Sequence, residues 1–111
     1  MTSFDVTDRP WHEHLVLTVT GEVDLDTAPA LRTALHGAIA AAPAGIIVDV
    51  GGLTFIDASG LNALAVAANR SAHLPGRLKL AAPPPRLDTL LKVTGLSDHL
   101  PVHPTYPLRP V

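Results

Sequence analysis

Residues 45 to 64 read GIIVDVGGLTFIDASGLNAL, and this stretch decides the fold. Its first six residues are apolar at nearly every position, a pattern typical of a strand that helices bury on both faces. GGLTFIDAS reads as the loop that follows this strand. A helix is predicted from about Ser59 to Ala72, because its larger apolar side chains fall on one helical face. The predicted buried face consists of Leu61, Leu64, Ala65 and Ala68.

The same alternation of strand and helix extends toward the N-terminus. LVLTVT, residues 15–20, reads as a strand, and GEVDLDT reads as a connecting loop. The next helix begins where Asp26 or Thr27 can cap it, with Pro29 in its first turn, and it ends at Pro43 and Gly45. Its apolar stripe consists of Leu31, Ala34, Leu35, Ala38 and Ile39.

Toward the C-terminus, PGRLKLAA predicts a turn and a strand, and PPPRLDTLLKVTG predicts a helix with Gly95 as its C-cap. The stripe of this helix consists of Leu87, Leu90, Leu91 and Thr94. SDHLPVH can hold a last short strand. With one or two strands at the N-terminus, the order predicts an α/β fold whose sheet is at least partly parallel.

The last eight residues, 104–111, form a proline-rich tail. A proline recurs at every third position from Pro101 to Pro110, which matches the three residues per turn of a polyproline II helix. Such a segment can bind an aromatic groove in a partner. The favoured interpretation is an extended tail that packs along the domain or stays loose.

The composition excludes several function classes. The 111 residues carry a net charge of −2 without a basic run, so no footprint for nucleic acid is present. The absence of Cys excludes disulfides and thiolate metal sites, and the two histidines of WHEH lack a third ligand. The longest apolar stretch is shorter than the roughly 18–20 residues of a membrane helix. We expect a cytoplasmic protein with neither a cofactor nor a metal site.

Ser59 admits three interpretations. It can be the N-cap of its helix, which position alone favours. A catalytic nucleophile is disfavoured, because Asp57-Ala58-Ser59-Gly60-Leu61 departs from the G-x-S-x-G pattern and no histidine has the context of a catalytic base. The third interpretation is covalent modification, since the N-terminus of a helix stabilises a phosphate.

A side of the predicted helix lies in line with Ser59. Its members, at helical spacings from Ser59, are Asn62, Ala63, Val66 and Arg70. These side chains are small, partly apolar and uncharged until Arg70, as in a surface that binds a protein partner. The pattern fits equally well a semi-exposed helix without a partner, and the residues leave both interpretations open.

Three segments together resemble the STAS domain of anti-sigma factor antagonists. GEVDLDTAPALRTAL is similar to the family's second strand, loop and first helix, and IIVDVGGLTFIDASGLNAL is similar to its central signature. VTGL, residues 93–96, is similar to the close of its last helix. The resemblance spans roughly residues 4 to 103 in the family's order. It implies a single STAS domain over residues 1–103, with a mixed sheet of four to five strands and three to four helices mainly on one face.

The resemblance also implies a mechanism. In this family the unphosphorylated antagonist binds an anti-sigma factor that is also a serine kinase, and this frees a sigma factor for transcription. The kinase then phosphorylates the signature serine with ATP, the complex dissociates, and a phosphatase resets the switch. The resemblance therefore implies a bacterial regulator of transcription that is not an enzyme. Its phosphoacceptor is Ser59.

The implied partner surface joins the loop beside the acceptor to the helical side described above. It consists of Glu22, Asp24, Asp57, Asn62, Ala63, Val66 and Arg70. Ala58 stands where the family often has another serine, so Ser59 is the only hydroxyl in the FIDASGL part of the signature. Asn62 stands where glycine is common, which can alter the choice of partner.

The alternative is a STAS subunit that docks on a transport ATPase, a permease or a stress-sensing complex, with Ser59 acting only as a cap. The sequence leaves open the sigma factor, the kinase and the oligomeric state.

Overall fold

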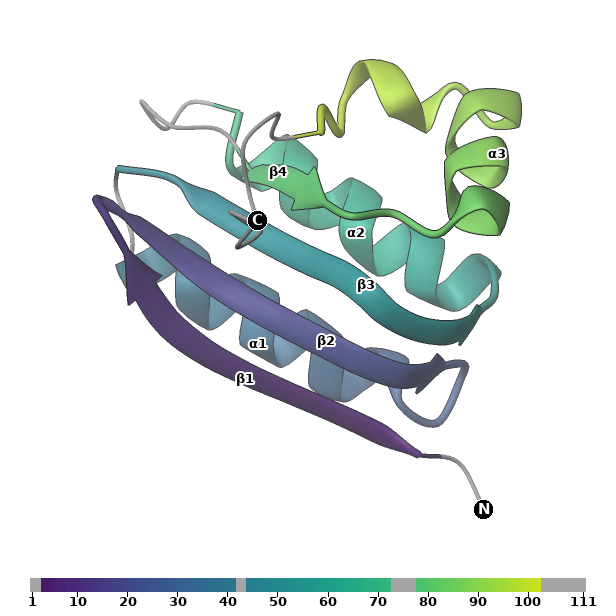
Figure 1. Cartoon of the computed structure of the whole chain (residues 1–111), viewed down its shortest axis with the longest axis horizontal. Coiled ribbons are helices and arrows are strands. Elements are labelled where there is room, and N and C mark those ends of the chain that lie inside the picture. Colours follow the sequence, from purple (N-terminus) through teal and green to yellow (C-terminus); the bar gives the residue numbers. More distant parts are fainter. Residues whose placement is uncertain (1–2, 42–43, 73–77, 103–111) are drawn as a thin grey trace, which may run out of the picture.

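The computed structural model describes residues 3–41, 44–72 and 78–102, and Figure 1 shows their arrangement. After an N-terminal hairpin, helices and strands alternate along the chain. In chain order the elements are β1 (Phe4–Trp11), β2 (His14–Val23), α1 (Ala28–Ala41), β3 (Ile46–Ile56), α2 (Ala58–Arg70), β4 (Leu78–Ala81), α3 (Pro85–Val93) and a 3₁₀ helix, η1 (Leu96–Asp98).

The strands within the described residues form one mixed sheet in the order β1-β2-β3-β4. β1 pairs with β2 antiparallel, and β3 is parallel to both of its neighbours. The two parallel connections contain helices, as the βαβ arrangement requires. The predicted α/β fold, with a mixed sheet of four to five strands and three to four helices, is confirmed.

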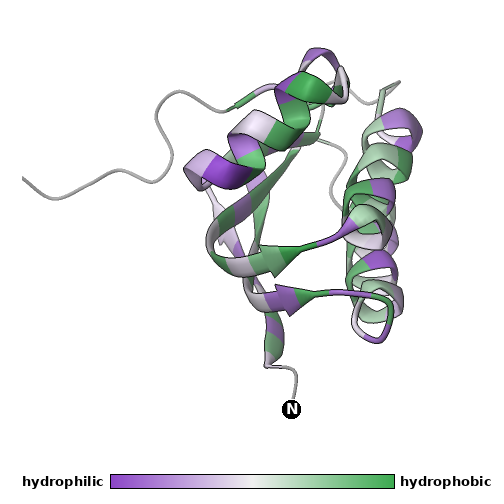
Figure 2. Ribbon diagram, turned by 90° about the vertical axis from the view of Figure 1, so that its right-hand side faces the viewer, coloured by the Kyte–Doolittle hydropathy of each residue, from purple (hydrophilic) through white to green (hydrophobic). Residues whose placement is uncertain are grey.

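Helices α1 and α2 lie side by side on one face of the sheet, as Figures 1 and 2 show from two directions. α3 and η1 continue beyond β4 (Figure 1). The main core fills the space between the helices and the sheet, and its side chains come from all of the helices and from β2, β3 and β4. Figure 2 shows the apolar residues of the helices turned toward the sheet.

The predicted stripe of α1 faces this core. Leu31, Leu35 and Ala38 are buried, and Ala34 and Ile39 are half-buried. Full burial of one leucine side chain is worth about 1.5–3 kcal/mol, so the stripe holds α1 on the sheet.

α3 likewise buries two side chains of its predicted stripe, Leu87 and Leu91. Gly95 follows its C-cap with a left-handed φ of 79°, so the predicted glycine end of this helix is confirmed.

β3 is buried on both faces in its first half, as predicted. Val48 belongs to the main core, whereas Ile47 belongs to a second cluster on the other face with Val16 and Ala81. Trp11 packs against this second cluster. The continuous apolar pattern of GIIVDV therefore reflects burial on two sides.

The two central strands are longer than the sequence predicted. GGLTF belongs to β3 and GEV to β2, although both segments read as loops. Gly52 pairs with Thr20 across the strands, and a Cβ on Gly52 would lie 2.7 Å from the Thr20 side chain. Glycine is therefore needed where β3 passes close to β2, and the pair of glycines does not mark a turn.

The predicted last strand is reduced to one bridge. Leu80 pairs with Val102, and the Leu80 amide donates to the Pro101 carbonyl at 2.9 Å. The start of the same segment forms η1 instead. The proline-rich tail from residue 104 onward lies outside the described residues, as does the turn predicted before β4.

Candidate functional site

The signature segment lies where β3 ends and α2 begins, at the right-hand end of the sheet in Figure 1. β2 ends beside it, because Val23 pairs with Ile56 and its carbonyl accepts the Asp57 amide at 3.1 Å. The ends of two parallel strands and the starts of two helices therefore meet at one edge. Of the predicted site residues, this edge brings together Glu22, Asp24, Asp57 and Ser59.

Asp57 is the N-cap of α2, with φ −110° and ψ −171°. Its Oδ1 atom accepts from the backbone amides of Ser59 at 2.9 Å and Gly60 at 3.2 Å, which satisfies two of the free donors at the helix start. The prediction that Ser59 caps the helix is wrong. Ser59 is the second residue of α2, and its hydroxyl donates to the same Asp57 oxygen at 2.5 Å.

The Asp57 carboxylate is held in its ionised form. The hydrogen bond from the Ser59 hydroxyl lowers its pKa most, and the backbone amides of Gly60 and Ser59 lower it further, whereas partial burial acts in the opposite direction. The net pKa lies below the ordinary value of 3.8. At neutral pH this oxygen is therefore an anionic acceptor for the hydroxyl.

Gly60 fixes how closely α2 approaches the sheet. It is buried, and a Cβ at this position would lie 2.6 Å from side-chain atoms of both Val23 and Ile56. The helix start is therefore pressed against the ends of β2 and β3. This contact fixes the position of Ser59, the preceding residue, relative to the sheet. The Ser59 side chain is half-buried there.

The neighbouring junction, between β2 and α1, also pairs an aspartate with a hydroxyl. The Asp24 carboxylate accepts from the amides of Asp26 at 2.9 Å and Thr27 at 3.1 Å. The Thr27 hydroxyl accepts from the Asp24 amide at 2.9 Å and donates to the Glu22 carbonyl at 2.9 Å. Thr27 stands at the predicted N-cap position of α1, because its carbonyl accepts the Leu31 amide at 3.2 Å. Its hydroxyl, however, bonds within the preceding loop and not to the amides of the helix.

Two apolar side chains at this edge are exposed, and the sequence reasoning missed both. Leu25 is 78% exposed in the loop between Asp24 and Asp26, and Phe55 is 45% exposed next to the end of β3. Exposed aromatic and leucine side chains beside polar groups are typical of protein-binding surfaces. The sequence held one sign of the exposed Leu25, which is its place between Asp24 and Asp26. A leucine between two charged residues of a loop contributes little to the stability of the fold.

The helical side assigned to a partner is only partly exposed. Asn62 and Arg70 are exposed and Val66 is half-buried, whereas Ala63 is fully buried in the main core. The prediction that Ala63 lies on the exposed surface is therefore wrong. Of the predicted buried face of α2, Leu64 and Ala68 are buried, whereas Leu61 and Ala65 are half-buried. Gly60, Ala63 and Ala67 are buried in addition.

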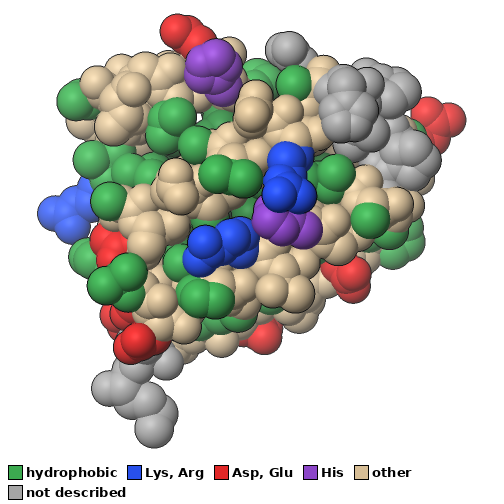
Figure 3. Space-filling view, turned by 180° about the vertical axis from the view of Figure 1, so that it is seen from behind, with side chains coloured by type: hydrophobic (Ala, Val, Ile, Leu, Met, Phe, Trp, Pro, Cys, Tyr) green, Lys and Arg blue, Asp and Glu red, His purple; other side chains and the backbone are tan. Residues whose placement is uncertain are grey.

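Arg70 lies at the far end of α2 from Ser59, about 16 Å along the helix axis at 1.5 Å per residue. Together, α1 and α2 carry two arginines and one histidine, which are Arg32, Arg70 and His36. Figure 3 shows the helix side of the molecule, with basic side chains beside a histidine near the middle, another basic side chain at the left margin, and most acidic ones toward the margins. Arg70 is therefore separated from the edge that holds Ser59 by the length of α2.

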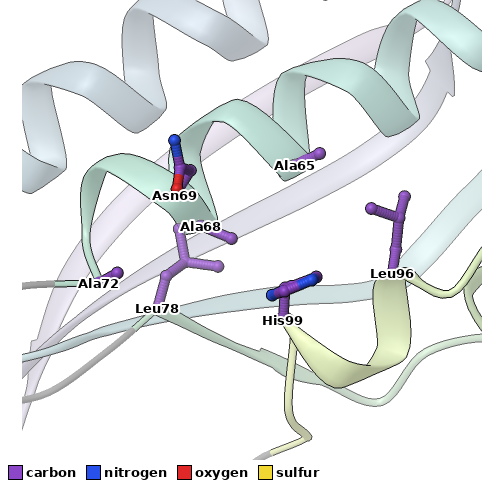
Figure 4. Close-up of a pocket in the computed structure, with 7 residues that line it drawn as sticks. All are labelled: Ala65, Ala68, Asn69, Ala72, Leu78, Leu96 and His99. Atoms are coloured by element: carbon purple, nitrogen blue, oxygen red, sulfur yellow. The ribbon is translucent and has the colours of Figure 1, made fainter.

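A cavity of about 260 Å³ lies between the second half of α2, β4 and η1. Figure 4 shows its lining, in which Asn69 and His99 are the polar side chains among alanines and leucines. The cavity does not include any residue of the Ser59 edge. The surface around Ser59 is therefore separate from this cavity.

Two further features were sought in the part of the chain that the structure describes. No group of three or more His, Cys, Asp or Glu side chains there could hold a metal ion. In the same residues no helix has the length and apolar character needed to cross a membrane.

The family model described as "Mlab, STAS domain" matches residues 8–104, which include every described strand and helix from β2 onward. The chain belongs to the STAS domain family. No curated protein sequence gives a match. The predicted family resemblance is therefore confirmed by the family model and by the fold.

Solved STAS structures resemble this chain along most of its length. An anti-sigma factor antagonist from Mycobacterium paratuberculosis is 28% identical, with a TM-score of 0.84 over 94% of this chain and 88% of that one. The Bacillus cell fate determinant SpoIIAA in its phosphorylated form is 24% identical, with a TM-score of 0.69 over 91% of each chain. A STAS-domain antagonist from Rhodobacter sphaeroides is 17% identical, with a TM-score of 0.57 over 71% and 86% of the chains.

Proposed function

We propose that this STAS domain is an anti-sigma factor antagonist whose binding is switched off by phosphorylation of Ser59. The unphosphorylated protein binds an anti-sigma factor that is also a serine kinase, and a sigma factor is released. The kinase then transfers phosphate from ATP to Ser59, and the complex dissociates until a phosphatase restores the hydroxyl. The protein itself acts in the cytoplasm as a binding partner and not as an enzyme.

The observation that carries this proposal is the place of the Ser59 hydroxyl. It is half-buried at an edge of the molecule, it donates to a carboxylate, and two exposed apolar side chains lie at the same edge. A kinase can reach such a hydroxyl from outside, whereas a hydroxyl inside the core is inaccessible. The similarity to the mycobacterial antagonist points to the same class of function.

The partner surface that we propose is centred on Ser59. Leu25 and Phe55 are its apolar anchors, and Glu22, Asp24 and Asp57 belong to the same two strand-to-helix junctions. Large apolar side chains near the centre of an interface contribute most of the binding energy. Asn62 and Val66 extend this surface along α2, and Arg70 contacts only a partner that reaches the far end of the helix.

Phosphorylation changes this surface in two ways. It adds about −1.5 to −2 charges beside Asp57 and places a strongly hydrated group in the proposed partner surface. The partner then loses apolar contact and has to bury charge, and both effects oppose binding. A coupling of about 1–3 kcal/mol between phosphate and partner is enough for a switch of 5- to 150-fold.

The test is a pull-down from the source cells with the wild-type protein and the Ser59→Glu variant as baits. The matched control is Thr89→Glu, which adds the same charge at an exposed hydroxyl of α3. We expect an ATP-binding kinase to be captured by the wild type and by Thr89→Glu, and to be lost with Ser59→Glu. Purified kinase and ATP should then label the wild type on Ser59.

Two outcomes would count against the proposal. If all three baits capture the same transport ATPase or permease, the protein is a docking subunit and Ser59 has no switching role. If a kinase binds Ser59→Glu as tightly as the wild type and does not label Ser59, the partner is correct but the switch is not.

A further inference from the structure

Asp57 contacts the Ser59 side chain directly, and this pair has a consequence for phosphoryl transfer. The Asp57 Oδ1 atom accepts the hydroxyl proton of Ser59 as well as two backbone amides. The two amides fix the carboxylate in place, since they belong to the first turn of α2. The direction of the Ser59 O–H bond is therefore set by a group that is itself held by the helix.

A hydroxyl whose proton points to a fixed acceptor presents its lone pairs in the other directions. Ser59 is half-buried, so those directions include the open side of the edge from which a phosphate donor has to approach. Attack on phosphorus requires a lone pair in line with the bond that breaks. The serine is thus oriented for transfer before a kinase binds.

We infer that Asp57 is a positioning residue for phosphorylation of Ser59, that it receives the proton of the hydroxyl, and that it then repels the phosphate. This inference rests on the proposed function, since it needs a kinase and ATP. Ser59 Oγ forms a bond to the γ-phosphorus, and the bond from that phosphorus to the bridging oxygen breaks. The electron pair of this bond leaves with ADP, and the hydroxyl proton passes to Asp57 and then to water.

A weakly basic carboxylate is sufficient for this step. In the loose transition state of phosphoryl transfer the attacking oxygen keeps its proton until the new bond is well formed, and by then the proton is strongly acidic. The low pKa of Asp57 keeps the carboxylate ionised and ready to accept the proton at neutral pH. The requirement on Asp57 is its position and its charge, rather than a raised pKa.

The same contact becomes repulsive after transfer. The ester oxygen of phosphoserine has no proton to donate, so the hydrogen bond to Asp57 is lost. A phosphate dianion and the Asp57 carboxylate then compete for the amides of Ser59 and Gly60. Since Asp57 is already bonded to both amides, the phosphate is directed outward, toward the surface that the partner covers.

The first experiment uses the full-length Asp57→Asn variant and the kinase captured by the wild-type protein. Asparagine is also a good N-cap, so α2 keeps its start while the charge at this position is removed. We expect the turnover rate for labelling of Ser59 to fall about 100-fold, a much larger change than any in KM for the protein, to which Asp57 contributes only as one residue of the partner surface. A merely structural role would raise KM or lower the unfolding midpoint instead.

The matched control is Asp49→Asn. Asp49 lies in β3 and accepts a backbone amide, that of Gly51 at 3.0 Å, through the same kind of short-range bond. It lies outside the Ser59 edge, and its substitution should leave labelling unchanged. Equal turnover of Asp57→Asn and wild type would overturn the positioning role while leaving the proposed function intact. Absence of labelling in the wild type would instead overturn both.

The second experiment needs no kinase. Phosphoserine is introduced at position 59 by genetic encoding, and the second pKa of its phosphate, ordinarily about 6, is measured by phosphorus NMR. We expect this pKa to be lower in the Asp57→Asn background than in the wild-type background, because removal of the carboxylate stabilises the dianion. An unchanged pKa would overturn the proposed repulsion.

Discussion

The two strand-to-helix junctions at the Ser59 edge each contain an aspartate and a hydroxyl side chain, but the two hydroxyls form different hydrogen bonds. Between β2 and α1, the Thr27 hydroxyl accepts the Asp24 amide and donates to the Glu22 carbonyl at 2.9 Å, and the Asp24 carboxylate is a second, longer acceptor at 3.3 Å. Between β3 and α2, the Ser59 hydroxyl donates to the Asp57 side chain. Both aspartates accept backbone amides in addition.

The difference separates a structural hydroxyl from one that can be modified. Phosphorylation of Thr27 would remove a donor that ties the loop to the Glu22 carbonyl and would place charge inside that loop. Phosphorylation of Ser59 breaks one side-chain contact, while Asp57 continues to cap α2 through the amides of Ser59 and Gly60. An aspartate followed by a hydroxyl residue is therefore not sufficient to indicate a phosphorylation switch. The group to which the hydroxyl donates determines whether its phosphorylation would disrupt the fold.

The largest effect on stability is expected where the two junctions touch, at Gly60. Gly60→Ala places a Cβ 2.6 Å from Val23 and Ile56 atoms, and overpacking of this kind costs about 1–3 kcal/mol. Gly37→Ala is the matched control in α1, because nothing lies within 4 Å of its Cβ position. It should stabilise the protein by about 0.4–1 kcal/mol. Urea unfolding measures both, and equal effects would show that α2 is not pressed against the strands.

A smaller difference is expected between the two hydroxyls. Thr27→Ala removes two bonds to the backbone and should lower the free energy of unfolding by about 1–2 kcal/mol. Ser59→Ala should cost less than about 0.5 kcal/mol, because the cap of α2 remains. Urea unfolding of both variants is the measurement. A loss for Ser59→Ala as large as that for Thr27→Ala would contradict the distinction between the junctions.

The cap itself is tested by two substitutions of Asp57. Asp57→Ala removes the acceptor of the Ser59 and Gly60 amides and should lower the urea midpoint, though less than Thr27→Ala does. Asp57→Asn keeps an acceptor oxygen and should shift the midpoint by a smaller amount still. Identical midpoints for alanine and asparagine would mean that the amides are satisfied without this side chain.

The smallest effect is expected from acid. The folded pKa of Asp57 is lowered, first by the Ser59 hydroxyl, so its ionised form is favoured by folding. Its contribution to stability is therefore fully present above pH 4 and is lost as the pH falls through the folded value, below 3.8. Urea unfolding at pH 7 and pH 3 should show a slightly smaller acid loss in Asp57→Asn than in wild type. NMR titration should also show a higher Asp57 pKa in Ser59→Ala.

The order of strands and helices could be predicted because the long apolar patterns are local. The stripe of Leu31 and Leu35 and the left-handed Gly95 are confirmed, since each depends on residues within a turn or two. The extension of β3 could not be predicted. Gly52 reads as a loop residue until β2 is placed beside it, and only the close Thr20 side chain explains why glycine is required.

The candidate site was predicted in its location but not in its details. The signature placed Ser59 at the start of a helix, and the structure agrees. The identity of the cap depends on which side chain reaches the free amides, and Asp57 lies two residues before the predicted helix start at Ser59. Ala63 was assigned to the surface because it lies one helical turn from Ser59, whereas the structure turns it into the core beside Leu64 and Ala67.

The most direct test of the central claim is the position of the phosphate. The wild-type protein is incubated with ATP and the kinase that it captures, and the modified residue is located by mass spectrometry of its peptides. The account predicts phosphate on Ser59, none on Thr27, and dissociation of the complex as Ser59 is modified. Phosphate on Thr27, or a complex that persists with Ser59 fully phosphorylated, would contradict it.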